Sequence, residues 1–175
     1  MKILVAYISK TGTTEEIAKR IGEILSAKGA ETNIDVEVAP IDAVGSVQGY
    51  DRLILGSPIN GMKVLPQFKE FLSTKVAGSN IPTDIFIISY LFERGRNFWK
   101  NAIRKNVESI RTLAGASSVE IFAGRLPGPL PAFARLIFGT PKDLPPDMRD
   151  WGKIEAWAEG IAGGMVESTA TTPVS

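Results

Sequence analysis

The sequence predicts an α/β protein built on an open, doubly wound parallel sheet. Five short apolar runs alternate with segments of helical periodicity along the chain. Most of these runs end in glycine, serine or aromatic residues, as strands do where they lead into loops. This alternation is typical of a parallel sheet with helices on both faces. At 175 residues, the chain is long enough for one such domain with a substantial core.

The first strand and helix are the most clearly marked elements. The run 3–8 is apolar and rich in β-branched side chains, which predicts a buried strand. From Glu15 onward, Ile17, Ile21 and Ile24 recur at helical spacing, which predicts a helix. A loop rich in hydroxyl groups therefore joins a strand end to the beginning of a helix.

The remaining elements follow the same alternation. Further strands are expected over 34–38, 53–55, 85–88 and 119–123, and helices from Pro66, over 97–113 and over 151–161. The third strand is expected to break at Gly56, and the helix 97–113 is expected to bury Phe98, Ala102, Val107, Ile110 and Leu113. We expect one domain over 1–163, a proline-rich insert over about 125–149, and a disordered tail over 164–175.

The loop after the first strand has the composition of a phosphate site. It consists of Ser9, Lys10, Thr11, Gly12, Thr13 and Thr14. Free N–H groups and the positive end of the helix dipole meet at such a position, and hydroxyl groups can donate to phosphate oxygens. The loop is neither a Walker P-loop nor a dinucleotide fingerprint, which favours a mononucleotide. The alternative is an ordinary capped turn, where Ser, Thr and Gly are common.

Two further loops end strands at the same edge of the predicted sheet. The loop 56–62 combines glycine, proline and asparagine, so its peptide groups could lie against a flat ring. The loop 89–97 brings Tyr90 and Phe92, which could stack on that ring or simply cover the sheet end. With the loop from residue 124 onward, these segments should form one site, since ligands bind beyond the carboxyl ends of the strands.

Composition limits the chemistry. The chain has no Cys and no His, which excludes thiol nucleophiles and the commonest general base and metal ligand. We expect no metal site and no catalytic side chain, so a bound cofactor would carry any demanding reaction. The net charge of +1 predicts no nucleic-acid partner. With no signal peptide or membrane span evident, we expect a cytoplasmic protein.

These motifs resemble the flavodoxin family over nearly the whole chain. The loop 9–14 is similar to the S/T-x-T-G-x-T phosphate loop of the family, and 51–58 to the strand before its second flavin loop. The resemblance implies a sheet order of 2-1-3-4-5 and non-covalent FMN. Its phosphate would be held by Ser9, Lys10 (through its backbone), Thr11, Gly12, Thr13 and Thr14. The isoalloxazine would be held by Pro58, Ile59, Asn60, Gly61, Met62, Ser89, Tyr90, Leu91, Phe92 and Arg94.

A narrower resemblance lies near the C-terminal end. The segments 122–126, 133–137 and 150–151 are similar to menaquinone-dependent protoporphyrinogen oxidases, which carry an insert before the last helix. This implies an oxidoreductase that exchanges electrons with a small-molecule or quinone redox partner. The alternatives are an electron carrier of the flavodoxin type and a flavin-binding interaction module without turnover.

The insert and the helix 97–113 also suggest surfaces for partners. Residues 132–138 could form two helical turns that expose Phe133, Leu136, Ile137 and Phe138, with at most weak membrane-surface contact, or could pack back on the domain. The cations Arg94, Arg96, Lys100, Arg104 and Lys105 could attract an anionic substrate or be a solvated helix face. A dimer is considered as an oligomeric state.

Overall fold

The computed structural model describes residues 1–30, 33–60, 63–90, 92, 96–126, 128, 131–139 and 145–170. The strands are β1 (Lys2–Tyr7), β2 (Asp35–Pro40), β3 (Arg52–Asn60), β4 (Lys63–Val64), β5 (Thr83–Ile88) and β6 (Ser118–Phe122). The α-helices are α1 (Thr13–Gly29), α2 (Pro66–Phe71), α4 (Asn97–Ala114), α5 (Ala132–Phe138) and α6 (Trp151–Ala170). Two short turns, 3₁₀ η1 (Ile41–Ala43) and π-helical η2 (Leu72–Val76), complete the described elements.

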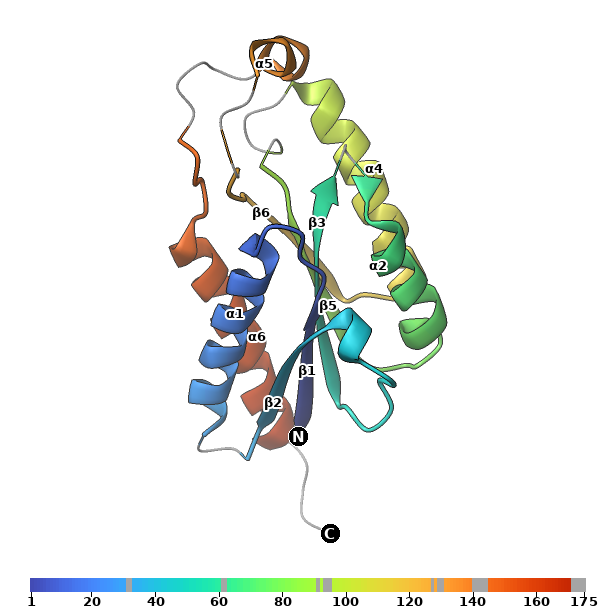
Figure 1. Ribbon diagram of the computed structural model, residues 1–175. Coiled ribbons are helices and arrows are strands. Elements are labelled where there is room, and N and C mark those ends of the chain that lie inside the picture. The colour runs from blue at the N-terminus through green and yellow to red at the C-terminus, as the bar shows by residue number, and fades with distance from the viewer. Residues whose placement is uncertain are drawn as a thin grey trace.

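The predicted fold class is confirmed. The five principal strands are parallel and follow the order β2-β1-β3-β5-β6, which is the expected 2-1-3-4-5. The two-residue strand β4 is an addition that pairs antiparallel with the end of β3. Helices α1 and α6 cover one face of the sheet, and α2 and α4 cover the other (Figure 1).

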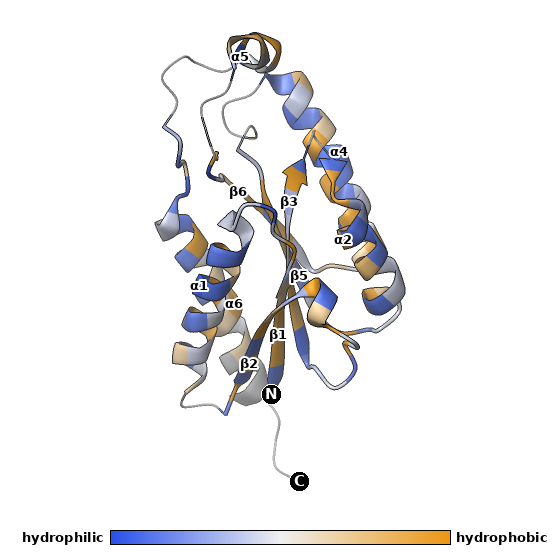
Figure 2. Cartoon of the chain, in the orientation of Figure 1, coloured by the Kyte–Doolittle hydropathy of each residue, from blue (hydrophilic) through white to orange (hydrophobic). Residues whose placement is uncertain are grey.

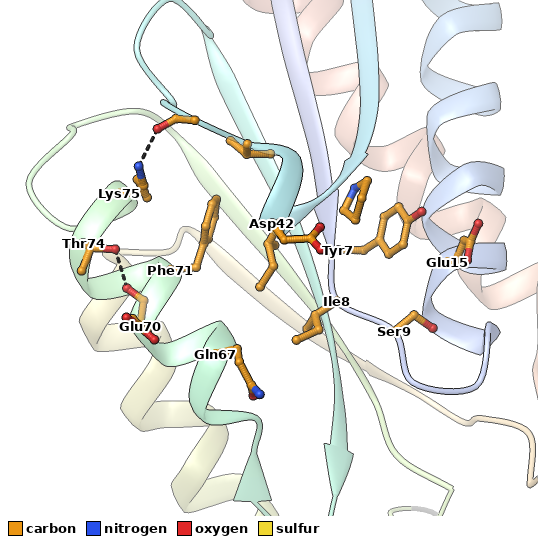
Figure 3. Close-up of a pocket in the computed structure, with 14 residues that line it drawn as sticks. Tyr7, Ile8, Ser9, Glu15, Asp42, Gln67, Glu70, Phe71, Thr74 and Lys75 are labelled. Atoms are coloured by element: carbon orange, nitrogen blue, oxygen red, sulfur yellow. Dashed lines mark hydrogen bonds between the residues drawn. The ribbon is translucent and has the colours of Figure 1, made fainter.

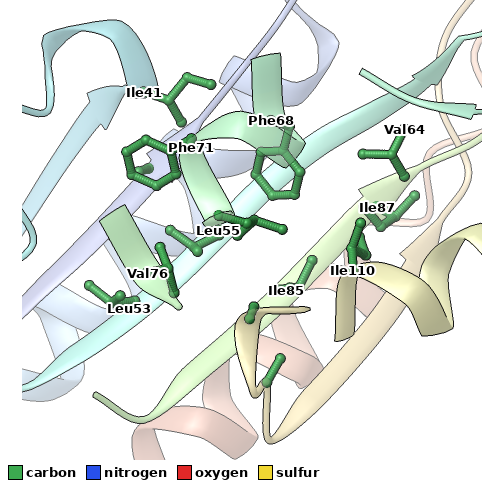
Figure 4. Close-up of a cluster of buried hydrophobic side chains, with 14 of the residues drawn as sticks. Ile41, Leu53, Leu55, Val64, Phe68, Phe71, Val76, Ile85, Ile87 and Ile110 are labelled. Atoms are coloured by element: carbon green, nitrogen blue, oxygen red, sulfur yellow. The ribbon is translucent and has the colours of Figure 1, made fainter. Parts of the chain in front are cut away.

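Each face of the sheet has its own apolar core. On one face, Phe68 and Phe71 of α2 pack with Leu55, Ile85 and other buried side chains of the sheet (Figure 4). The opposite cluster joins α1 and α6 to the other side of the same strands. Central strands are therefore apolar along both faces, as the continuous run in β5 predicts.

The expected break of the third strand at Gly56 is wrong. Strand β3 continues through Gly56 to Asn60, and residues up to Pro58 pair with β5. A Cβ built at Gly56 would lie 2.1 Å from Cζ of Phe86. The glycine therefore accommodates an aromatic ring from the neighbouring strand, which a local reading of the sequence cannot detect.

The expected buried face of α4 is correct only in its middle. Val107 and Ile110 are buried, but Phe98 is 71% exposed and Leu113 is 37% exposed. The helix instead buries Ile103, and Ala114 completes the buried stripe. At roughly 100° per residue, Phe98 lies about 140° around the helix from Ile103, so the two cannot face the same core.

The last helix is longer than expected. We expected it to end at Ile161 and a disordered tail to begin at 164, whereas α6 continues to Ala170. Ala162 and Met165 are buried in the cluster shared with α1, which gives the added turns an apolar contact. The expectation of disorder is thus wrong for 164–170, and 171–175 lie outside the described residues. Over the described part of the chain, no helix combines the length and apolarity needed to cross a bilayer.

Candidate functional site

A cavity of about 280 Å³ lies where the carboxyl ends of β1, β3, β5 and β6 meet. Its lining comes from four separate segments of the chain. It consists of Lys10, Thr11, Thr13, Thr14, Pro58, Ile59, Asn60, Ile88, Tyr90, Gly124, Arg125 and Leu126. The structure therefore brings together eight of the residues that the sequence predicted for one site.

The loop 9–14 enters α1 through a left-handed turn at Gly12. Its φ is +83°, a conformation that a residue with a Cβ adopts only with strain. The carbonyl of Gly12 accepts from the N–H of Glu16 at 2.9 Å, so the helix begins at Thr13, two residues before the expected start. This turn is what places Thr13 and Thr14, both buried, at the helix N-terminus.

The hydroxyl of Thr13 is available to a ligand in the cavity. Its Oγ1 is buried and has no hydrogen-bond partner among the described residues, and Thr13 is only 4% exposed. An orphaned buried hydroxyl costs free energy unless a ligand or water satisfies it. An anion in this cavity would accept that hydrogen bond and face the positive end of α1. The residues present therefore fit a phosphate group.

The second predicted loop is a hairpin, not an irregular loop. Ile59 pairs with Val64 and Asn60 with Lys63 in the antiparallel β3–β4 ladder. Pro58, Ile59 and Asn60 line the cavity from this hairpin. The two remaining predicted residues of the segment, Gly61 and Met62, lie outside the described residues.

The third predicted segment contributes chiefly Tyr90. Tyr90 lines the cavity, its hydroxyl donates to the carbonyl of Pro145 at 3.0 Å, and burial raises the pKa of that hydroxyl. Ser89 is buried and donates through its N–H to Phe122, so it supports the strand end instead of lining the cavity. Phe92 packs against the core on the α2 and α4 face, with the Arg104 guanidinium 5.6 Å from its ring centroid. Leu91 and Arg94 lie outside the described residues.

The base of the insert forms the remaining wall of the cavity. The loop from residue 124 was expected at the site, but none of its residues was named. Its two ends are joined in an antiparallel manner: Leu126 donates to Pro146 at 2.8 Å, and Met148 donates to Gly124 at 3.2 Å. Arg125 therefore faces the cavity together with Lys10, so two cations accompany the hydroxyl groups. The sequence feature that could have identified Arg125 is its position directly after Gly124, the glycine that follows the last predicted strand.

Ion pairs fasten this base to the first turn of α1. Glu16 accepts from Arg125 at 2.9 Å and also from Arg149, whose guanidinium pairs with Asp147 as well. The Arg149 side chain is only 7% exposed, and it lies over the ring of Trp151. The hydrogen bond from Arg149, the largest cause in each case, holds the pKa of Glu16 and the pKa of Asp147 below their ordinary values.

These lowered pKa values make the stability of the protein depend on pH. Because the folded state favours the ionised carboxylates, their contribution is complete above the ordinary pKa values of 4.5 and 3.8. It is lost as the pH falls through the lower folded values. We expect Arg149→Gln to flatten this acid-dependent loss, measured as the free energy of unfolding in urea between about pH 6 and pH 3. Arg111→Gln, which removes an exposed pair with Glu108, should leave the slope unchanged, and an unchanged slope in both variants would contradict the assignment.

A larger cavity of about 770 Å³ lies on the other side of β1, between η1 and α2 (Figure 3). Ser9 lines this cavity and not the smaller one, although its buried Oγ also lacks a partner among the described residues. The carboxylates of Glu15, Asp42 and Glu70 border this larger cavity. Burial of the Tyr7 hydroxyl raises its pKa, and the nearby negative charge of Glu15 raises it further. Three carboxylates disfavour a dianion, so the smaller cavity is the better phosphate site.

The fold and the smaller cavity together define a class of protein. It is a doubly wound α/β protein whose cavity fits a phosphate group and lies at the switch point between β1 and β3. The model of the flavodoxin domain family matches residues 4–142. The chain belongs to this family, which confirms the expected resemblance at that level.

Solved structures agree on the fold. A flavodoxin from the domain Archaea is 18% identical, with a TM-score of 0.56, and the match covers 94% of this chain and 98% of that one. Flavodoxin 1 from Bacillus cereus is 14% identical, with a TM-score of 0.54 and coverage of 95% and 98%. Rubredoxin oxygen:oxidoreductase from Desulfovibrio gigas is 17% identical, with a TM-score of 0.58, covering 97% of this chain but 37% of that larger one.

Proposed function

We propose that this protein binds FMN and works as an oxidoreductase that passes electrons from a small reductant to a quinone-type acceptor. The observation that carries the cofactor assignment is the orphaned hydroxyl of Thr13 in a cavity at the N-terminus of α1. Membership of the flavodoxin domain family supports the same cofactor. When bound, FMN would supply the hydride and electron-transfer chemistry that a chain without Cys and His lacks.

The residues of the cavity divide into two groups. Thr11, Thr13 and Thr14 would donate to the phosphate, and Lys10 and Arg125 would offset its charge. Pro58 to Asn60 on the hairpin, and Tyr90, would enclose the flat ring, with the Tyr90 hydroxyl fixed by Pro145. The protein thus contributes position, donors and exclusion of water from the ring.

The acceptor is inferred from the insert and the charge. The base of the insert forms one wall of the cavity. A second substrate would therefore meet this wall as well as the loops at the edge of the sheet. The net charge of the chain is +1, so the chain lacks the excess of acidic residues that suits docking to basic redox proteins. These features favour a small apolar acceptor over a protein partner.

An electron carrier is the second candidate, and the comparisons favour it. Membership of the flavodoxin domain family supports this candidate, and the matches to two flavodoxins cover both chains almost from end to end. A carrier would cycle its cofactor without turning over a pair of small substrates.

Anaerobic turnover assays test the proposal. The FMN-loaded protein is mixed with NADH, NADPH or protoporphyrinogen as reductant and menadione as acceptor, and oxidation of the reductant is followed by absorbance. Turnover that rises with FMN occupancy supports the proposal, and free FMN at the same concentration is the control. Reversible photoreduction without turnover by any pair would establish the carrier instead. Protein that stays colourless after incubation with FMN would overturn both assignments.

A further inference from the structure

The end of the molecule that carries the insert exposes a group of large apolar side chains. On α5, Phe133 is 68% exposed, Leu136 is 74% exposed and Ile137 is 50% exposed. Their spacing of i, i+3 and i+4 places them on one face of the helix. Phe98, in the first turn of α4, is 71% exposed. We call these four residues the apolar tip.

Contacts with α4 hold the tip in place. The indole Nε1 of Trp99 donates to the carbonyl of Ile137 at 3.1 Å, and the rings of Phe98 and Trp99 are 4.9 Å apart. The turn after α5 lies directly on the Arg96 side chain, because a Cβ at Gly139 would fall 2.5 Å from Arg96 Nε. The tip is therefore built from both helices, at the top of the molecule in Figure 1.

Positive charge surrounds the apolar tip. The first turns of α4 and the residue before it carry Arg96, Lys100, Arg104 and Lys105, and α5 carries Arg135. Among the described residues 96–107 and 131–139 there is no carboxylate side chain, and the first on α4 is Glu108. Figure 2 shows hydrophilic residues along this end of α4 beside the hydrophobic α5.

We propose that the apolar tip and its cations dock on an anionic lipid bilayer. Exposed aromatic and aliphatic side chains can enter the boundary between headgroups and acyl chains, while Lys and Arg remain at the anionic headgroups. A second copy of this chain fits less well, because pairing two equivalent tips would place cations against cations.

Docking in this way would bring the cofactor cavity toward the membrane. The insert that carries α5 begins and ends at the wall of the cavity, through Arg125 and its bridge to Asp147. In this respect the inference deepens the proposed function, since quinones reside in bilayers. Binding to lipid is nevertheless measured without any turnover, so either assignment can fail alone.

Vesicle flotation with the FMN-loaded protein tests the docking. We expect binding to phosphatidylcholine vesicles that contain roughly one third phosphatidylglycerol, and little binding to phosphatidylcholine alone. High salt should weaken the binding, because each cation near an anionic surface strengthens it about fivefold. Equal binding to both vesicles, or none to either, would overturn the proposal.

Matched substitutions locate the surface. Leu136→Ser and Lys100→Gln/Lys105→Gln should each weaken binding to anionic vesicles about tenfold or more. Leu113→Ser, at the far end of α4, and Lys28→Gln, at the end of α1, should leave binding unchanged. If Leu136→Ser binds as the parent does, the tip is not the docking surface. If gel filtration finds a dimer that Leu136→Ser dissociates, the tip is an interface between copies and the proposal is wrong. Menadione reduction in solution reports on the proposed function separately.

Discussion

Replacing Thr13 by Val should raise the dissociation constant for FMN about 10- to 100-fold, because the hydroxyl that meets the phosphate is removed. A hydrogen bond to a charged group contributes about 1.5–3 kcal/mol, and each 1.4 kcal/mol is a factor of ten. Valine keeps the β-branched shape and nearly the volume of threonine, so packing of the helix start is conserved. Quenching of flavin fluorescence on titration measures the affinity.

Riboflavin, which lacks the phosphate, provides the internal control. Its affinity should be the same for the parent protein and Thr13→Val, and the free protein should be no less stable, since the hydroxyl has no partner among the described residues. Thr74→Val removes a hydroxyl that donates to the Glu70 carbonyl at 2.7 Å in the turn after α2, and it should alter neither affinity. An equal loss of FMN and riboflavin affinity would mean that Thr13 contacts the ring, and the phosphate assignment would fail.

Gly56→Ala should lower the free energy of unfolding by about 3 kcal/mol, the upper range of overpacking in a core. The added methyl group would lie 2.1 to 2.7 Å from three atoms of the Phe86 ring. That ring cannot easily withdraw, because Phe86 is fully buried and its edge contact with Trp157 has a centroid distance of 6.2 Å. Urea unfolding followed by far-ultraviolet circular dichroism measures the change.

Two variants separate this clash from the ordinary effect of a glycine substitution. A Cβ at Gly45 meets no atom within 4 Å, so Gly45→Ala should change stability by less than about 0.5 kcal/mol. Combining Gly56→Ala with Phe86→Leu should cost less than the sum of the two single changes, because the smaller side chain relieves the contact. Additive effects, or equal effects at Gly45 and Gly56, would show that the Phe86 ring is not the cause.

The loop 9–14 is the part of the candidate site that local sequence specifies well. A strand, a turn with Gly12 and a helix start are consecutive in the chain, so their order alone predicts that free N–H groups and hydroxyls meet there. Tyr90 and the segment 58–60 were predicted because parallel strands end at one edge of a sheet. Arg125 was not, because its place at the cavity depends on the pairing of the two ends of the insert across about 20 intervening residues.

By itself, the sequence determined the class of fold and the position of the hydroxyl-rich loop 9–14 between the first strand and the first helix. These follow from periodicity and from residues that are neighbours in the chain, whereas the order of the strands was implied by the family resemblance. Only the tertiary structure decided why Gly56 is a glycine, which side of α4 is buried, and that Phe98 joins α5 in an exposed apolar tip. The physical reason is the same in each case. Whether a position is buried or exposed depends on side chains from distant segments, and a local pattern of residues does not contain them.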